Sequence, residues 1–228
     1  MTYTRGIGIV FGRVIHWIVR GLALSRIHPN VLTFIGLLIN VAAAALLATG
    51  QFRWAGAVII GAGLFDMVDG RVARETNRVT RFGGFFDSVL DRYSDLALLV
   101  GLLVWYGSIN RFGYVVLTAI VMTGSVMVSY TRARAENTIP QCKVGFMERP
   151  ERIVLIILGA LFNRWGAMAP VLWVLAVLST ITVIHRISYT YQMTKHLAPV
   201  RDTKPLALRG QPAEATPELQ SAPTAPRA

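Results

Sequence analysis

The chain has 228 residues, of which 54% are hydrophobic and only 15% are charged, and its formal net charge is +11. About a quarter of the residues of a soluble domain are charged, so this composition excludes an ordinary water-soluble globule. Apolar runs of about 20 residues, the length that a helix needs to cross a bilayer, recur along the chain. Most arginines flank or enter these runs, which favours an anionic, phosphate-bearing membrane partner over nucleic acid.

The segment 1–28 is predicted to lie along a membrane surface. Arg5, Arg13 and Arg20 interrupt an otherwise apolar sequence, a pattern typical of an amphipathic helix in the headgroup plane. A short transmembrane helix is the alternative, but three arginines are costly in hydrocarbon. Pro29 then breaks the chain and suits the start of the next helix.

Six apolar runs follow, and each predicts a membrane-spanning helix. The predicted spans are 30–49, 54–76, 83–107, 112–136, 149–164 and 167–193. We therefore expect an all-α integral membrane protein, with six transmembrane helices after an N-terminal interfacial amphipathic helix. The transmembrane domain would cover 29–195. The segment 196–228 is rich in Pro and Ala without an apolar period, which predicts a disordered tail.

Arginine and lysine are unevenly distributed among the junctions between these helices. The N-terminal segment and the second–third and fourth–fifth junctions hold four or five each, whereas the other three junctions hold only Arg53, Arg111 and Arg164. Cytoplasmic loops are the basic ones in membrane proteins. We therefore expect both termini and the two basic junctions to face the cytoplasm, with the protein in the inner (plasma) membrane of the cell.

Four carboxylates stand in one stretch that joins the second and third predicted helices. Asp66 and Asp69 are three residues apart, so they share one helical face. Asp87 and Asp91 are four apart and share a face of the next helix. The short junction makes the two helices antiparallel neighbours, so the four groups can converge. Clustered carboxylates need cations to stay ionised, and such oxygen ligands suit Mg²⁺, Mn²⁺ or Ca²⁺. Two ions held there would stabilise phosphoryl transfer from a diphosphate.

Three further residues of this stretch suit a phosphate-bearing ligand. Gly70 lets a nucleotide approach the helix backbone closely. Arg74, one turn further on, can reach a phosphate, and Thr80 in the junction can hydrogen-bond the same ligand. Helix capping or pairing with a nearby arginine would explain a single aspartate, but four together in a membrane protein favour a functional site.

The stretch matches the signature of the CDP-alcohol phosphotransferases, D-x2-D-G-x2-A-R-x8-G-x3-D-x3-D, at every fixed position. These positions are Asp66, Asp69, Gly70, Ala73, Arg74, Gly83, Asp87 and Asp91. The chain resembles that family over about residues 10–193. The resemblance implies six helices, an N-terminal interfacial helix, and transfer of a phosphatidyl group from a CDP-linked lipid to an alcohol, with release of CMP.

The resemblance also implies a role for each residue of the site. Asp66, Asp69 and Asp87 would be metal ligands. Asp91 would contact metal and act as general base on the acceptor hydroxyl, which must lose its proton during attack. CDP-diacylglycerol would be the donor, and two Mg²⁺ or Mn²⁺ ions the cofactor. The residues expected to contact the CDP moiety are Pro29, Asn30, Val31, Leu32, Gly70, Arg74 and Thr80.

A second set of residues, all arginines, is predicted to bind the acceptor. Arg132 lies at the end of the fourth predicted helix, and Arg149 and Arg152 lie at the start of the fifth. Arg186 lies near the cytoplasmic end of the sixth. Converging arginines are what a phosphorylated acceptor needs. Positive-inside anchoring is the alternative, although glutamates alternate with the arginines that open the fifth helix.

The segments ARAE, ERPER and DRYSD resemble those of the bacterial phosphatidylinositol phosphate synthases, which join CDP-diacylglycerol to inositol phosphate. That resemblance implies that Arg132, Arg152 and Arg186 hold inositol phosphate, and the wider family implies a homodimer. Arginine at position 132 and the 137–147 loop depart from the pattern. A phosphatidylglycerophosphate synthase, with glycerol 3-phosphate as acceptor, is the alternative enzyme. A cation transporter using the same carboxylates is the alternative of another class.

Overall fold

The computed structural model describes residues 29–75 and 80–195. Side chains at position 29 and within 67–75 are not described. The predicted N-terminal amphipathic helix and the predicted disordered tail lie outside these residues, so both stay predictions, as do the corresponding domain boundaries.

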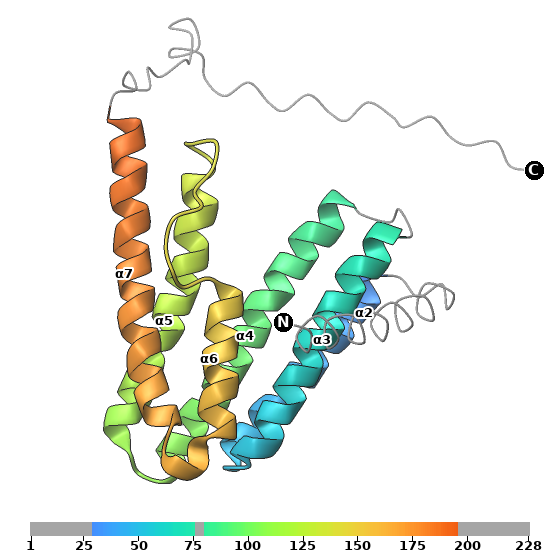
Figure 1. Ribbon diagram of the computed structural model, residues 1–228, viewed down its shortest axis with the longest axis vertical. Coiled ribbons are helices and arrows are strands. Elements are labelled where there is room, and N and C mark those ends of the chain that lie inside the picture. The colour runs from blue at the N-terminus through green and yellow to red at the C-terminus, as the bar shows by residue number, and fades with distance from the viewer. Residues whose placement is uncertain (1–28, 76–79, 196–228) are drawn as a thin grey trace, which may run out of the picture. The chain divides into compact units, whose positions relative to one another are not determined.

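The secondary structure of the described residues consists of helices alone, without a strand (Figure 1). Its elements are α2 (Pro29–Ala48), α3 (Phe52–Glu75), α4 (Arg81–Ser108), α5 (Phe112–Ala135), α6 (Arg149–Leu161), η1 (Asn163–Trp165) and α7 (Met168–Thr194). The predicted all-α class is confirmed, and each of the six α-helices lies where an apolar run predicts it. The largest difference is at α6, which ends before position 164 because a 3₁₀ turn follows, closed by Gly166 in the left-handed conformation (φ 73°).

Three of the described helices are long and apolar enough to cross a membrane, namely α2, α5 and α7. Helix α6 has 13 residues, which corresponds to a length of about 20 Å. Helices α3 and α4 are continuous, but charged residues of the predicted site interrupt their apolar sequences. The all-helical membrane architecture therefore stands, while six complete spans stay a prediction.

The six helices form a closed ring. Going around it, α2 packs on α3, α3 on α6, α6 on α7, α7 on α5, α5 on α4, and α4 on α2 (Figure 1). The short junction between α3 and α4 predicts that these two helices are direct neighbours. Instead their extensive contacts are both with α2, which lies against the two of them. The ring thus consists of three sequential hairpins: α2–α3, α4–α5 and α6–α7.

Small residues permit the closest helix crossings of the ring. A Cβ atom on Gly101 of α4 would overlap the backbone carbonyl oxygen of Ala44 in α2. A Cβ atom on Gly124 of α5 would lie 2.9 Å from the Cβ of Ser179 in α7. Such crossings are typical of membrane bundles, where close packing replaces the hydrophobic effect as the attraction between helices.

Candidate active site

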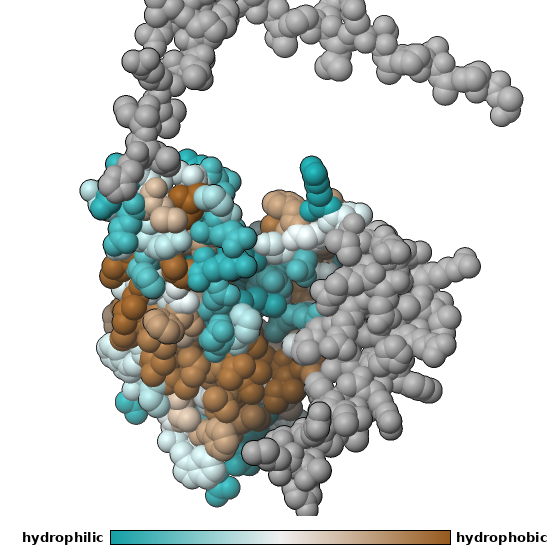
Figure 2. Space-filling model, turned by 45° about the horizontal axis from the view of Figure 1, so that its top comes forward, coloured by the Kyte–Doolittle hydropathy of each residue, from teal (hydrophilic) through white to brown (hydrophobic). Residues whose placement is uncertain are grey.

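Polar residues gather at the end of the ring where α3 ends and α4 begins. Figure 2 turns this end forward and shows hydrophilic residues in a hollow, with apolar residues over the body below. Helix α6 contributes its first turn, because the loop after α5 runs back down beside that helix before α6 starts (Figure 1). Residues from α3, α4, α5, α6 and α7 can therefore meet in the hollow.

Arg149, the first residue of α6, brings together carboxylates from two other helices. Its Nη2 lies 3.0 Å from Oδ2 of Asp66 in α3, and its Nη1 lies 3.0 Å from Oδ1 of Asp91 in α4. Its Nε lies 3.4 Å from Oδ1 of Asp95, one turn further along α4. One guanidinium group thus pairs with three carboxylates.

Asp87 belongs to the same electrostatic cluster. It interacts with the charges of Asp66 and Arg149, and Asp91 interacts in turn with Asp87 and Asp66. Three of the four carboxylates that the sequence predicts at the metal site are therefore close in space. The fourth, Asp69, lies in α3 one turn beyond Asp66, and its side chain is outside the described residues.

The chemistry of this cluster fits a divalent metal ion. All of its acidic groups offer hard oxygen atoms, and like-charged carboxylates on facing helices require a nearby positive charge. Arg149 supplies such a charge among the described side chains. Within those side chains, no three His, Cys, Asp or Glu residues are arranged as a ready metal cage. The metal-ligand roles accordingly stay predictions.

Asp95 and Arg152 form a buried ion pair beside this cluster. The exposed fractions of the two residues are 2% and 1%, and Nη2 of Arg152 donates a hydrogen bond to Oδ2 of Asp95. The Nε and Nη1 groups of Arg152 are buried without a hydrogen-bond partner among the described residues. An unpaired buried donor costs about 1–3 kcal/mol, so these groups are suited to an anionic ligand.

The sequence analysis missed Asp95, although a signal was present. Asp95 follows Asp91 by four residues, so both lie on the same face of α4. The family signature ends at Asp91, so it does not include Asp95, although the same helical face continues to that residue.

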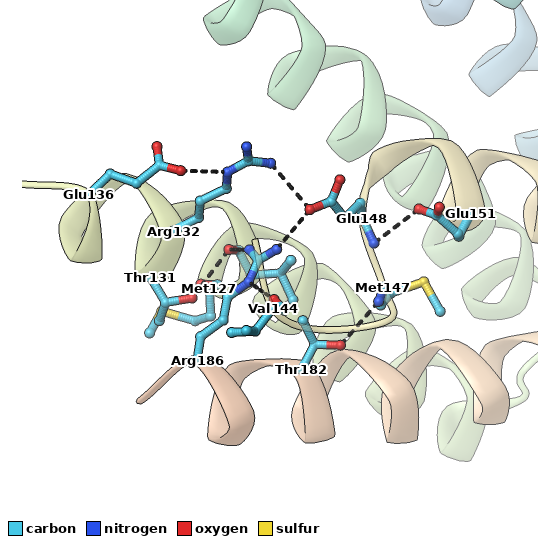
Figure 3. Close-up of polar contacts among 11 residues, drawn as sticks. Met127, Thr131, Arg132, Glu136, Val144, Met147, Glu148, Glu151, Thr182 and Arg186 are labelled. Carbon is cyan, nitrogen blue, oxygen red and sulfur yellow. Dashed lines mark hydrogen bonds and ion pairs between the residues drawn. The ribbon is translucent and has the colours of Figure 1, made fainter. Parts of the chain in front are cut away.

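Arg132 and Arg186 meet on a single carboxylate, that of Glu148 (Figure 3). Nη1 of Arg132 and Nη2 of Arg186 each lie 3.2 Å from Oε1 of Glu148. Arg186 is almost fully buried in α7, and its Nε also donates to the carbonyl oxygen of Val144, at 2.8 Å. This second network ties the end of α5, the loop and α7 to the start of α6.

The four arginines that the sequence assigns to the acceptor are thus all gathered by the first turn of α6, but in two pairs. Arg132 and Arg186 contact Glu148, whereas Arg149 and Arg152 contact Asp95. Arg149 additionally faces the carboxylates of the predicted metal site. The sequence does not reveal this division, because it depends on how the preceding loop delivers α6 into the ring.

The residues predicted to bind CDP lie where α2 and α4 begin. The hydroxyl group of Thr80 caps α4 by accepting a hydrogen bond from the Gly83 N–H at 2.9 Å. A Cβ atom on Gly83 would lie 3.4 Å from Oδ1 of Asn30, so the two helix starts are close. Val31 is half exposed, whereas Leu32 is packed in the core. The side chains of the remaining predicted contacts are outside the described residues: Pro29, Gly70 and Arg74.

Gly36 in α2 also shapes the site, and the sequence analysis did not single it out. A Cβ atom at this position would lie 2.9 Å from Oδ1 of Asp66. The absence of a side chain therefore lets α2 pass directly behind this carboxylate and leaves its position undisturbed.

A family model described as CDP-alcohol phosphatidyltransferase matches residues 26–185, which include all of the cluster described above. The chain belongs to the CDP-alcohol phosphatidyltransferase family. This confirms the resemblance inferred from the signature. The chain is therefore a membrane phosphotransferase of phospholipid biosynthesis, and the transporter alternative is not supported.

Several relatives of this phosphatidyltransferase have named activities. It is 36% identical over 185 residues to the phosphatidylinositol phosphate synthase of Mycobacteroides abscessus, covering 77% of this chain and 83% of the relative. It is 38% identical over 168 residues to the archaetidylinositol phosphate synthase of Methanothermobacter thermautotrophicus, covering 72% of this chain and 83% of the relative.

The fold of this phosphatidyltransferase is similar to that of a solved relative. The crystal structure of the Mycobacterium tuberculosis phosphatidylinositol phosphate synthase with CDP-DAG bound has a TM-score of 0.74 and 35% identity, covering 78% of this chain and 94% of that chain. A crystal structure of that enzyme in complex with manganese and citrate has a TM-score of 0.71 and 36% identity, covering 76% and 87%.

Proposed function

We propose that this phosphatidyltransferase transfers the phosphatidyl group of CDP-diacylglycerol to inositol phosphate, forming phosphatidylinositol phosphate and CMP. One observation carries the choice of a phosphorylated acceptor. Arg152 is buried beside the carboxylate cluster, and two of its N–H groups have no partner among the described residues. The names of the relatives support inositol phosphate as the particular acceptor.

The donor assignment is supported by the relative solved with CDP-DAG bound. In the proposed complex, the CDP moiety lies between the starts of α2 and α4 and the end of α3. Asn30, Val31 and Thr80 line this region with described side chains. Leu32 would contribute through its backbone, because its side chain is buried. Arg74 would pair with a phosphate, and Gly70 would allow close approach of the nucleotide.

We propose a divalent cofactor, Mg²⁺ or Mn²⁺, bound as two ions. The manganese complex of the solved relative supports this assignment. The ions, when bound, would neutralise charge on the diphosphate of the donor and so stabilise CMP as the leaving group. The residues that would hold them are Asp66, Asp69, Asp87 and Asp91.

In the proposed reaction, the acceptor hydroxyl oxygen attacks the phosphorus atom of the phosphatidyl group. Asp91 accepts the hydroxyl proton as the new P–O bond forms, and the bond from that phosphorus to the CMP oxygen breaks. Arg152 pairs with the acceptor phosphate through its free N–H groups, and Asp95 fixes the orientation of Arg152. Arg149, which contacts both Asp91 and Asp95, aligns the base with the acceptor site.

The membrane placement is part of the same proposal. All six helices would traverse the inner membrane, with the carboxylate end at the cytoplasmic face, and the enzyme would act as a homodimer. The distribution of arginine and lysine among the junctions supports this orientation.

The acceptor assay is the direct test. Purified full-length protein is given CDP-diacylglycerol, Mg²⁺ and labelled inositol phosphate, glycerol 3-phosphate, inositol or serine in separate reactions. We expect labelled lipid and CMP release with inositol phosphate. Product from glycerol 3-phosphate instead would make the chain a phosphatidylglycerophosphate synthase. Product from free inositol or serine alone would refute recognition of the acceptor phosphate.

A further inference from the structure

The end of the ring opposite the carboxylates is basic and, among the residues that the structure describes, lacks acidic side chains. It consists of the junctions of the three hairpins, 49–51, 109–111 and 162–167, which lie together at the bottom of Figure 1. The arginines at this end are Arg53, Arg111 and Arg164. The described acidic side chains lie elsewhere, on α3, α4 and α6 and in the loop between α5 and α6. All of them are between the middle of the ring and its carboxylate end.

Two cavities at this end share the residue Asn163. Arg53 and Arg164 line an open cavity of about 530 Å³, together with Asn163. Arg111 lines a second cavity, of about 280 Å³, which Asn163 also lines. The first volume is within the range of about 300–1,000 Å³ that is usual for ligand sites. All three basic residues of this end therefore face space that adjoins Asn163.

The polar groups around Asn163 are poised to donate hydrogen bonds. Oδ1 of Asn163 accepts a hydrogen bond from the Met168 N–H at 3.3 Å, so its NH₂ group is the one left to donate. None of the three arginines forms an ion pair with another described residue. Guanidinium and amide donors without a carboxylate between them match the oxygen atoms of a phosphate.

Exposed aromatic side chains place the same end at the level of lipid headgroups. Trp54 is 69% exposed, and Trp165 and Phe112 are about as open. Tryptophan is enriched at membrane–water interfaces. Trp54 also lines the larger cavity, so the phosphate of a phospholipid in the adjoining leaflet is an anion within reach of that cavity. In the orientation that the proposed function includes, positive-inside anchoring does not explain these arginines, because it places cations at the other face.

We propose that this end of the enzyme is a binding site for the headgroup phosphate of an anionic phospholipid. Arg53 and Arg164 pair with the phosphate oxygens in the larger cavity, Arg111 adds positive charge from the adjoining cavity, and the amide of Asn163 donates a hydrogen bond. Because each hairpin contributes one arginine, the bound lipid links all three hairpins of the ring. The site does not depend on which acceptor the active site uses.

The test compares lipid binding by full-length variants in detergent. Dioleoyl phosphatidylglycerol or dioleoyl phosphatidylcholine is titrated against each protein, with native mass spectrometry measuring affinity and thermal unfolding measuring stabilisation. The variant R53Q/R111Q/R164Q is expected to bind phosphatidylglycerol on the order of a hundredfold more weakly, since each basic group near a membrane surface contributes about fivefold. Its phosphatidylcholine affinity should change little.

Two further variants make the test specific. Asn163→Asp keeps the acceptor oxygen used by Met168 but replaces the donating NH₂ with negative charge, so it should weaken phosphatidylglycerol binding while the fold persists. This variant carries the test if the triple variant fails to fold. The matched control R134Q/K143Q/K195Q removes the same number of charges from the opposite end, and it should retain the arginine-dependent stabilisation.

Two results would overturn the proposal. The first is equal phosphatidylglycerol affinity and stabilisation in the wild-type protein, the triple variant and Asn163→Asp. The second is stabilisation by millimolar inorganic phosphate that equals that of the lipid and depends on the same arginines, because the site would then take free phosphate and not a lipid.

Discussion

Asp91 and Asp95 lie one turn apart on α4 in different environments, which implies different roles. The side chain of Asp91 retains 19% exposure and pairs with Arg149 at the edge of the hollow. The side chain of Asp95 retains 3% and pairs with the buried Arg152. We expect the first to exchange a proton with a substrate, and the second to act through Arg149 and Arg152, the two arginines that it contacts.

Asp91→Asn is expected to lower transfer by about 10²–10⁴-fold, because the amide cannot accept the acceptor proton. Binding of CDP-diacylglycerol should persist. CMP release and equilibrium binding of the donor measure the two effects. Glu151→Gln is the matched carboxylate-to-amide control, since glutamine also serves the capping box at the start of α6. Loss of donor binding along with activity would make Asp91 primarily a ligand.

Variants of the Asp95–Arg152 ion pair can distinguish its contribution to stability from a role in positioning the acceptor. Asp95→Ala should destabilise the enzyme by about 3–5 kcal/mol, because it leaves a buried charge unpaired. The double variant D95L/R152M should recover stability, because apolar residues often replace buried ion pairs without loss. It should still show a raised acceptor KM, with the donor KM nearly unchanged. Equal changes in both KM values would remove Arg152 from the acceptor site.

Gly36 offers a test of the metal-site geometry without touching a carboxylate. Gly36→Ala places a methyl group against Asp66, and displacing a reacting group by about 1 Å can cost 10²-fold in rate. Gly63→Ala on α3 is the control, because its added Cβ meets nothing within 4 Å. Both changes should leave thermal stability equal or higher, since alanine favours helix. Full activity of Gly36→Ala would show that Asp66 tolerates displacement.

Among the elements, α6 does most to assemble the site. Its first turn is fixed by a reciprocal capping box between Glu148 and Glu151 and by a proline. The sequence is enough to predict the helix, as well as the two helical faces that bear the aspartates. It is not enough to predict that Arg149 faces Asp66, because that contact follows from the path of a loop with no periodic pattern.

The close α2–α4 crossing should be sensitive to any side chain added at Gly101. Gly101→Ala pushes a methyl group against a backbone carbonyl, which cannot rotate away, so we expect destabilisation of about 1–3 kcal/mol. Gly107→Ala, on the same helix with open space around it, is the control. Thermal unfolding in detergent compares the two. Equal melting temperatures of the two variants would mean that α2 and α4 can move apart without loss of stability.

At the scale of the whole molecule, the sequence predicts the parts better than their order. Apolar runs identify all six described α-helices, because each run is bounded by polar junctions. The order around the ring is not encoded in that way. Helices buried against any apolar neighbour have the same pattern, and the close crossings depend on single glycines such as Gly101. The direct α3–α4 contact predicted from a short junction therefore gave way to packing of both helices on α2.

The shortness of α6 has a consequence for how two dissimilar substrates meet. A hydrocarbon core is about 30 Å thick, whereas the 13 residues of α6 make a helix about 20 Å long, which is too short to cross the core alone. Helices α5 and α7 extend well beyond the first turn of α6, which carries guanidinium and carboxylate groups (Figure 1). Under the proposed function, a water-soluble acceptor would reach this turn from the aqueous side, while the lipid donor would enter sideways from its leaflet. Each substrate would then be taken directly from the medium that dissolves it.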